Sequence, residues 1–89
     1  MPGGVALGEG FETLRRANFE RLLDRLSGWI ALDGARLLEV GCGRGWFLQA
    51  ARSRRMLVHG IEPGPDVELA RGLGLSVDAG FFPANLSVP

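Results

Sequence analysis

The chain has 89 residues, of which 46% are hydrophobic, so it can form one small domain with one core and is too apolar for a disordered segment. Ten arginines balance ten acidic residues. This net charge of zero excludes the strongly basic surface that attracts nucleic acid or anionic membranes, and we predict neither as a partner.

The cysteine content restricts the kinds of site that this protein can contain. A single cysteine, Cys42, excludes an internal disulfide and a multi-cysteine metal site, so no metal is predicted and a reducing, cytoplasmic location is expected. No apolar stretch approaches the length of a membrane span, and the N-terminus lacks a signal pattern. Residues 1–8 are predicted to form a flexible lead-in.

The first periodic segment runs from about residue 9 to residue 30. Its apolar residues recur at helical spacing and its charged residues cover the other face, which predicts an amphipathic helix that packs on the rest of the chain. The apolar stripe comprises Phe11, Leu14, Phe19, Leu22, Leu23, Leu26, Trp29 and Ile30. Phe19 and Trp29 are expected in the core or, alternatively, at the mouth of a substrate site.

Strands and helices alternate through the remainder. The pattern predicts strands over residues 36–40, 56–61 and 75–78, with helices over residues 46–54 and 65–72. Pro65 suits the first helical position, and Gly72 and Gly74 end that helix. This order predicts an α/β fold with a partial parallel sheet of about three strands and flanking helices.

Three parallel strands normally belong to a larger sheet that is covered on both faces. We therefore expect these residues to be the N-terminal part of a longer domain. An open sheet edge would also allow self-association.

A glycine-rich turn lies between the first strand and the following helix. Gly41, Gly43 and Gly45 alternate, whereas the dinucleotide fingerprint requires glycines at its first, third and sixth positions. Trp46 stands at the sixth position, and Glu39 would repel a pyrophosphate. Both features disfavour NAD.

The same acid suits a cationic nucleoside. S-adenosylmethionine carries a sulfonium, an ammonium and one carboxylate, so Glu39 can lie near the ammonium while turn amides receive the carboxylate. Glu62 follows the second strand, seventeen residues after Gly45. Because adjacent strand ends lie about 5 Å apart, Glu62 is expected to face the same crevice and accept hydrogen bonds from ribose hydroxyls.

At this point the chain resembles the class I S-adenosylmethionine-dependent methyltransferases. The stretch 37–45 is similar to their first motif, acid-x-Gly-x-Gly-x-Gly, and 60–63 is similar to their second-strand end. The resemblance implies a Rossmann-like fold with an extra N-terminal helix (residues 9–33) before a cofactor-binding unit (residues 34–89). It implies methyl transfer to an unknown acceptor, which we expect to be a small molecule.

The resemblance also implies the cofactor contacts. An acid after the third strand often contacts adenine in this family; Asp78 could serve, or Phe81 or Phe82 could stack on the ring. The predicted cofactor-binding residues are Glu39, Gly41, Cys42, Gly43, Gly45, Glu62, Asp78 and Phe81. Catalytic residues are expected beyond Pro89.

Some of these residues also have simpler, structural interpretations. Cys42 is predicted to be a packing residue of the turn and not a nucleophile. His59 is predicted to lie in the core or on the face of the sheet. The chain could be a non-catalytic module that at most binds cofactor or self-associates. A weaker alternative is an NAD-type domain.

Overall fold

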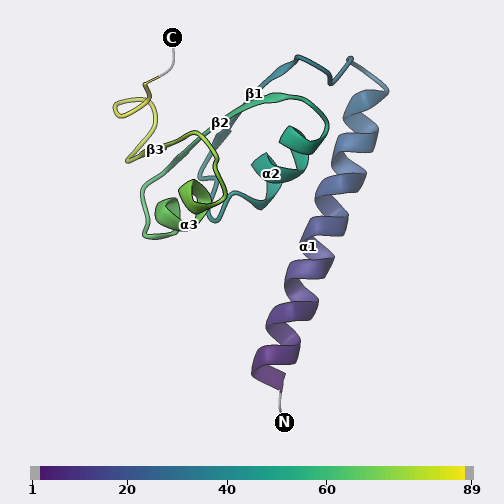
Figure 1. The fold of residues 1–89 in the computed structure, drawn as a ribbon, viewed down its shortest axis with the longest axis vertical. Coiled ribbons are helices and arrows are strands. Elements are labelled where there is room, and N and C mark those ends of the chain that lie inside the picture. Colours follow the sequence, from purple (N-terminus) through teal and green to yellow (C-terminus); the bar gives the residue numbers. More distant parts are fainter. Residues whose placement is uncertain (1–2, 88–89) are drawn as a thin grey trace.

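The computed structural model describes the backbone of residues 3–87 and the side chains of residues 10–87. Three helices alternate with three strands along the chain (Figure 1). They are α1 (Gly3–Ser27), β1 (Arg36–Val40), α2 (Trp46–Ser53), β2 (Leu57–Glu62), α3 (Asp66–Gly72) and β3 (Val77–Ala79). None of the helices in this part of the chain is long and apolar enough to cross a membrane.

The strands form one parallel sheet in the order β1-β2-β3, which confirms the predicted α/β class. Val40 lies beside Ile61, and Glu62 lies beside Ala79, so all three strands end at the same edge. Parallel strands need crossover connections, and α2 and α3 supply them.

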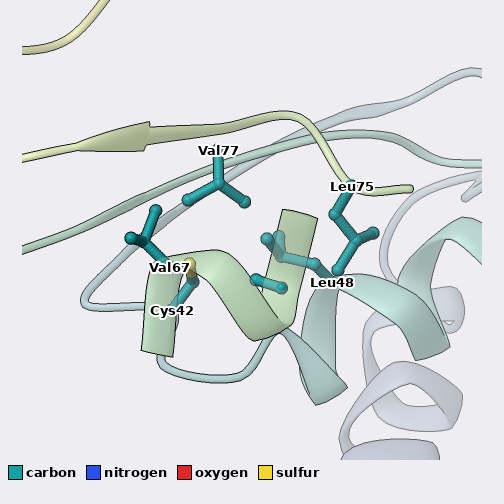
Figure 2. Close-up of a cluster of buried hydrophobic side chains, with 6 residues drawn as sticks. Cys42, Leu48, Val67, Leu75 and Val77 are labelled. Atoms are coloured by element: carbon teal, nitrogen blue, oxygen red, sulfur yellow. The ribbon is translucent and has the colours of Figure 1, made fainter. Parts of the chain in front are cut away.

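Both crossover helices cover the same face of the sheet. A cluster of buried side chains fills the space between them and the strands: Cys42, Leu48, Val67, Ala70, Leu75 and Val77 (Figure 2). The opposite face carries exposed apolar side chains, among them Leu38, Val40 and Leu57. Alternation along β1 and β2 separates these exposed residues from Leu37 and Val58, which pack against the cluster.

The second cluster attaches α1 to α2. Leu23 and Ala51 are fully buried there beside Leu32 and Met56. The ring centroids of Phe19 and Phe47 lie 5.2 Å apart. At the edge of this contact, the Arg54 guanidinium donates hydrogen bonds to the carboxylates of Glu20 and Asp24.

Much of the predicted stripe on α1 is nevertheless exposed, including Phe11, Leu14 and Leu22. For Phe11 and Leu14 the reason is length, since the 25 residues of α1 span about 37 Å, whereas the eight residues of α2 span about 12 Å. Only part of α1 can therefore be covered, and Figure 1 shows its N-terminal half extending past α2. Leu22 lies beside the fully buried Leu23, so length does not account for its exposure.

Two further expectations need correction. Trp29 is 86% exposed, because α1 ends at Ser27 and the indole lies in the turn beyond the packed stripe, so its assignment to the core was wrong. Helix α1 begins at Gly3, so residues 3–8 of the predicted lead-in are helical, while residues 1–2 lie outside the described part.

Candidate functional site

The glycine turn joins β1 to α2 at the carboxyl edge of the sheet. The amides of Gly41 and Cys42 donate to the Ile61 carbonyl oxygen, at 2.8 and 3.3 Å, and so extend the pairing of β1 with β2. The turn therefore lies directly beside the end of β2, where Glu62 stands. The glycine turn and Glu62 are far apart in the sequence, and the parallel pairing of β1 with β2 brings them together.

The glycines of the turn have different roles. Gly45 has a φ of +87° and is buried under α3, where a Cβ would overlap Leu75 Cδ1 and lie 3.1 Å from Ala70 Cβ. Gly43 has a φ of +55°, and no described atom lies within 4 Å of where its Cβ would be. Gly45 thus permits close helix packing, whereas Gly43 leaves the turn open toward solvent.

Glu62 fixes the shape of the turn. Its Oε1 accepts a hydrogen bond from the Gly43 amide at 2.8 Å, and its Oε2 accepts one from the Gly64 amide at 2.9 Å. Each carboxylate oxygen can accept a further hydrogen bond. The side chain is therefore held in place with acceptor capacity remaining.

Glu39 lies on the helix-covered side of β1 and lines a cavity of about 380 Å³. Its Oε1 is buried, and no hydrogen-bond partner for it exists in the described part of the chain. Burial, opposed by Arg15 and reinforced by Glu62, raises the pKa of Glu39 to about 7. A buried acceptor without a partner is costly, and a cationic group would remove that cost.

The cavity has walls from separate parts of the chain. The turn contributes Gly41, Cys42, Gly43 and Arg44. Helix α2 contributes Trp46 and Phe47, and Asp66 begins α3. Helix α1 contributes Phe11, Arg15 and Phe19, so the leading helix forms part of the cavity as well as part of the core.

The side chain of Cys42 packs in the core, as predicted from the sequence. It is 7% exposed and belongs to the cluster of Figure 2, with Val67 beside it. Burial, together with the charges of Glu39 and Glu62, raises the pKa of its thiol to about 11. A neutral, buried thiol is a poor nucleophile.

Four predicted contacts do not line the cavity: Gly45 and Glu62, whose places are given above, and Asp78 and Phe81. Asp78 Oδ2 is 2.8 Å from His59 Nε2 and accepts a hydrogen bond from the Ser87 amide, and these bonds hold the pKa of Asp78 at about 2. His59 lies on the sheet face, as expected, and its Nδ1 is 2.7 Å from Ser76 Oγ. Phe81 is 68% exposed, and neither Asp78 nor Phe81 lines the cavity.

Sequence reasoning found only part of the contribution of α1 to the cavity. Phe19 was given a place at the mouth of a site as an alternative to the core, whereas Phe11 was assigned to the packed stripe and Arg15 to the opposite, charged face, yet all three line the cavity. The signal was present in the spacing, since residues four apart lie on one helix face and here an arginine separates two aromatic residues. Trp46 was also missed; the guanidinium of Arg16 lies 5.3 Å from its ring centroid.

Comparison with protein families finds a match over residues 11–89 to the family described as "Methyltransferase domain". The chain belongs to this family. The match includes the cavity-lining part of α1, the glycine turn and Glu62, so the methyltransferase domain covers every element that forms the site.

A solved structure supports the fold of this methyltransferase domain. A SAM-dependent methyltransferase from Archaeoglobus fulgidus matches 78% of the chain at 23% identity, with a TM-score of 0.63. The cyclase SpnF matches 79% at 38% identity, with a TM-score of 0.49. The chain spans 29% of the length of each of these two structures. Comparison with curated protein sequences gives no match.

Proposed function

We propose that the cavity beside the glycine turn binds S-adenosylmethionine, and that this chain is the cofactor-binding portion of a methyltransferase. The observation that carries the proposal is Glu39, an acid with a buried, unpartnered oxygen at the wall of a cavity lined by that turn. The family match supports the same activity. The methyl acceptor is unassigned.

Glu39 fits the amino-acid end of this cofactor. Its ammonium offers several hydrogen-bond donors and a positive charge, which match the orphaned oxygen of Glu39. A cation near Glu39 would also favour the ionised carboxylate, against the burial that raises its pKa to about 7. A pyrophosphate at the same place would face a carboxylate instead of a cation.

The ribose end fits Glu62. This carboxylate is already oriented by the amides of Gly43 and Gly64, so little conformational freedom is lost when it accepts ribose hydroxyls. The space where a Cβ of Gly43 would lie is open, so this turn leaves room beside Glu62. Contacts of Asp78 or Phe81 with adenine stay predictions, as do the cytoplasmic location and a small-molecule acceptor.

When bound, S-adenosylmethionine supplies an activated methyl group on a sulfonium that leaves as a neutral thioether. The residues of this chain would bind and orient it: Glu39 and the turn at the amino-acid end, Glu62 at the ribose. Such positioning is a large part of catalysis by direct displacement. No residue of the described part of the chain is assigned to hold or deprotonate an acceptor.

Isothermal titration calorimetry tests the proposal. The chain should bind S-adenosylmethionine and its demethylated product, S-adenosylhomocysteine, and should not bind NAD. Glu39→Gln removes the charge but preserves the shape, and should weaken binding of both ligands. Binding of NAD without binding of either nucleoside would reverse the assignment.

The main alternative is a non-catalytic module that self-associates through its sheet. Within residues 3–87, β1 pairs only with β2, and Val40 and Leu57 are exposed on the uncovered face. Such an edge can pair with a second copy. Sedimentation equilibrium distinguishes the two: a strict monomer at high concentration would count against edge pairing.

A further inference from the structure

A row of polar side chains crosses the sheet on the face that the helices leave uncovered. His59 lies at its centre, beside the exposed Leu38 of β1. Its Nε2 is 2.8 Å from Asp78 Oδ2, and its Nδ1 is 2.7 Å from Ser76 Oγ. The side chains of His59 and Asp78 are only 14% and 19% exposed, so solvent screens this pair less than it screens a pair on the surface.

Asp78 connects this row to the segment that follows β3, residues 81–87, at the yellow end of the chain in Figure 1. Its Oδ2 also accepts a hydrogen bond from the Ser87 amide at 2.7 Å, although the two residues are nine positions apart. The segment is closed on itself, because the Asn85 amide donates to the Phe81 carbonyl oxygen and the Phe81 amide donates to Asn85 Oδ1, both at 2.9 Å. One carboxylate oxygen thus joins the imidazole of β2 to the return of this segment onto the sheet.

The segment also contacts the sheet through Leu86. This side chain is half-buried and lines a cavity of about 500 Å³ with Leu57 and His59, among others. The other residues of segment 81–87 are exposed. Burial of apolar surface therefore contributes little to holding the segment, and its polar anchor at Asp78 contributes correspondingly more.

The charge of His59 decides how strong this anchor is. An imidazole changes charge between about pH 5 and pH 8. The protonated ring donates to Asp78 as a cation, whereas the neutral ring with its proton on Nε2 donates the same bond without charge, and a charge-assisted hydrogen bond is roughly twice as strong. Asp78 stays ionised across this range, because the hydrogen bond with His59 and then that from the Ser87 amide lower its pKa from 3.8 to about 2.

Two other charged residues face His59 from the neighbouring strands. Strand β1 contributes Arg36, which lines the cavity with His59, and β3 contributes Asp78. The other residues of β2 on this face are apolar, and residues 81–87 include no titratable side chain. Arg36 disfavours a second cation and Asp78 favours it, and the carboxylate is the closer of the two because it contacts the ring directly.

We propose that His59 and Asp78 form a proton-dependent clasp that holds residues 81–87 against the sheet and loosens as the imidazole loses its proton. The clasp lies on the face opposite the cavity of the glycine turn, so it does not depend on the proposed function. It is linked to the carboxyl edge of the sheet by Gly80, whose amide donates to the Glu62 carbonyl oxygen at 3.0 Å. The clasp therefore also fixes the direction in which the chain leaves the edge beside Glu62.

Amide hydrogen exchange followed by NMR tests the clasp on the intact chain. The quantity measured is the protection factor of the Ser87 amide from pH 5 to pH 8, which already corrects for the intrinsic effect of pH on exchange. His59→Gln keeps a donor that cannot be protonated, and Asp78→Asn keeps an acceptor without charge. Asp33→Asn is the matched control, since it removes an exposed carboxylate that pairs with Arg55 instead.

In the wild-type chain, the protection factor of Ser87 should fall about fivefold from pH 5 to pH 8, the difference between a charge-assisted and a neutral hydrogen bond. The same amide should be less protected at pH 5 in His59→Gln and in Asp78→Asn, and its protection should not vary with pH in either variant. Asp33→Asn should keep the wild-type profile.

Three results would overturn the clasp. A flat wild-type profile would mean that the proton on His59 does not act on the segment. A profile that still falls with pH in His59→Gln would assign the effect to another group, such as Glu39. A profile that still falls in Asp78→Asn would mean that the carboxylate is not the anchor. The wild-type profile needs no substitution, so it decides between clasp and no clasp even where a variant loses its circular dichroism.

Discussion

Replacing Gly45 with alanine tests the role of the turn in packing. Gly45 has a φ of +87°, and its Cβ would overlap Leu75 Cδ1 and approach Ala70. Gly43 offers a matched comparison two residues away, with a φ of +55° and no described atom within 4 Å of its Cβ position. Both substitutions add the same methyl group to a left-handed backbone, and only one adds it to a filled space.

The expected magnitudes follow from these two differences. A left-handed alanine costs about 1–2 kcal/mol, partly offset by the lower chain entropy of the unfolded alanine variant, so Gly43→Ala should lose about 1 kcal/mol. Gly45→Ala adds overpacking against Leu75 and Ala70, which costs about 1–3 kcal/mol more. We expect Gly45→Ala to lose about 3 kcal/mol in total.

Urea unfolding followed by far-ultraviolet circular dichroism measures both losses. Gly34→Ala is the control, because Gly34 has a φ of +79°, open space around it and a position remote from the glycine turn. Its loss should match that of Gly43→Ala. Equal losses at Gly43 and Gly45 would refute the assignment of Gly45 to helix packing.

Three further predictions concern charge, ribose binding and the core. The pKa of Glu39 is raised from 4.5 to about 7, so the folded chain holds a proton that the unfolded chain releases between these values. The free energy of unfolding should therefore fall as the pH rises through this window, while affinity for S-adenosylhomocysteine should rise, and Glu39→Gln should flatten both profiles. Glu62→Ala should weaken the binding of S-adenosylhomocysteine by about 1–3 kcal/mol, as measured by calorimetry, and an unchanged affinity would remove Glu62 from the site. Leu23→Ala should cost about 3 kcal/mol in urea unfolding and Trp29→Ala less than about 0.5, since only Leu23 is buried; comparable losses would contradict the packing of α1.

Local patterns in the sequence were sufficient for the elements of the α/β unit. The apolar run before the glycines predicts β1 at its observed bounds, and β2 and β3 begin one and two residues later than predicted. These elements follow from hydrophobic periodicity and turn residues, which act within a few positions. Glu39 and Glu62 could be paired from the sequence because parallel strands end at a common edge.

Other features required tertiary structure. Which residues of the predicted stripe are buried depends on where α1 ends and on which of its faces α2 covers, and periodicity assigned Trp29 and Leu22 to the same stripe as Leu23. The partner of Asp78 depends on the register of β3 against β2, which places His59 within hydrogen-bond reach. Neither relation is encoded by spacing along one segment.

The sequence by itself thus determined the glycine turn, its flanking acids and the alternation of strands and helices, because each depends on short-range spacing and backbone preferences. The tertiary structure alone decided that Arg15 and Glu39 line the same cavity, because this depends on how α1 is rotated against α2. That rotation is set by the burial of Leu23 and the contact of Phe19 with Phe47, which fix the packed face of α1 and bring Arg15 to the wall of the cavity.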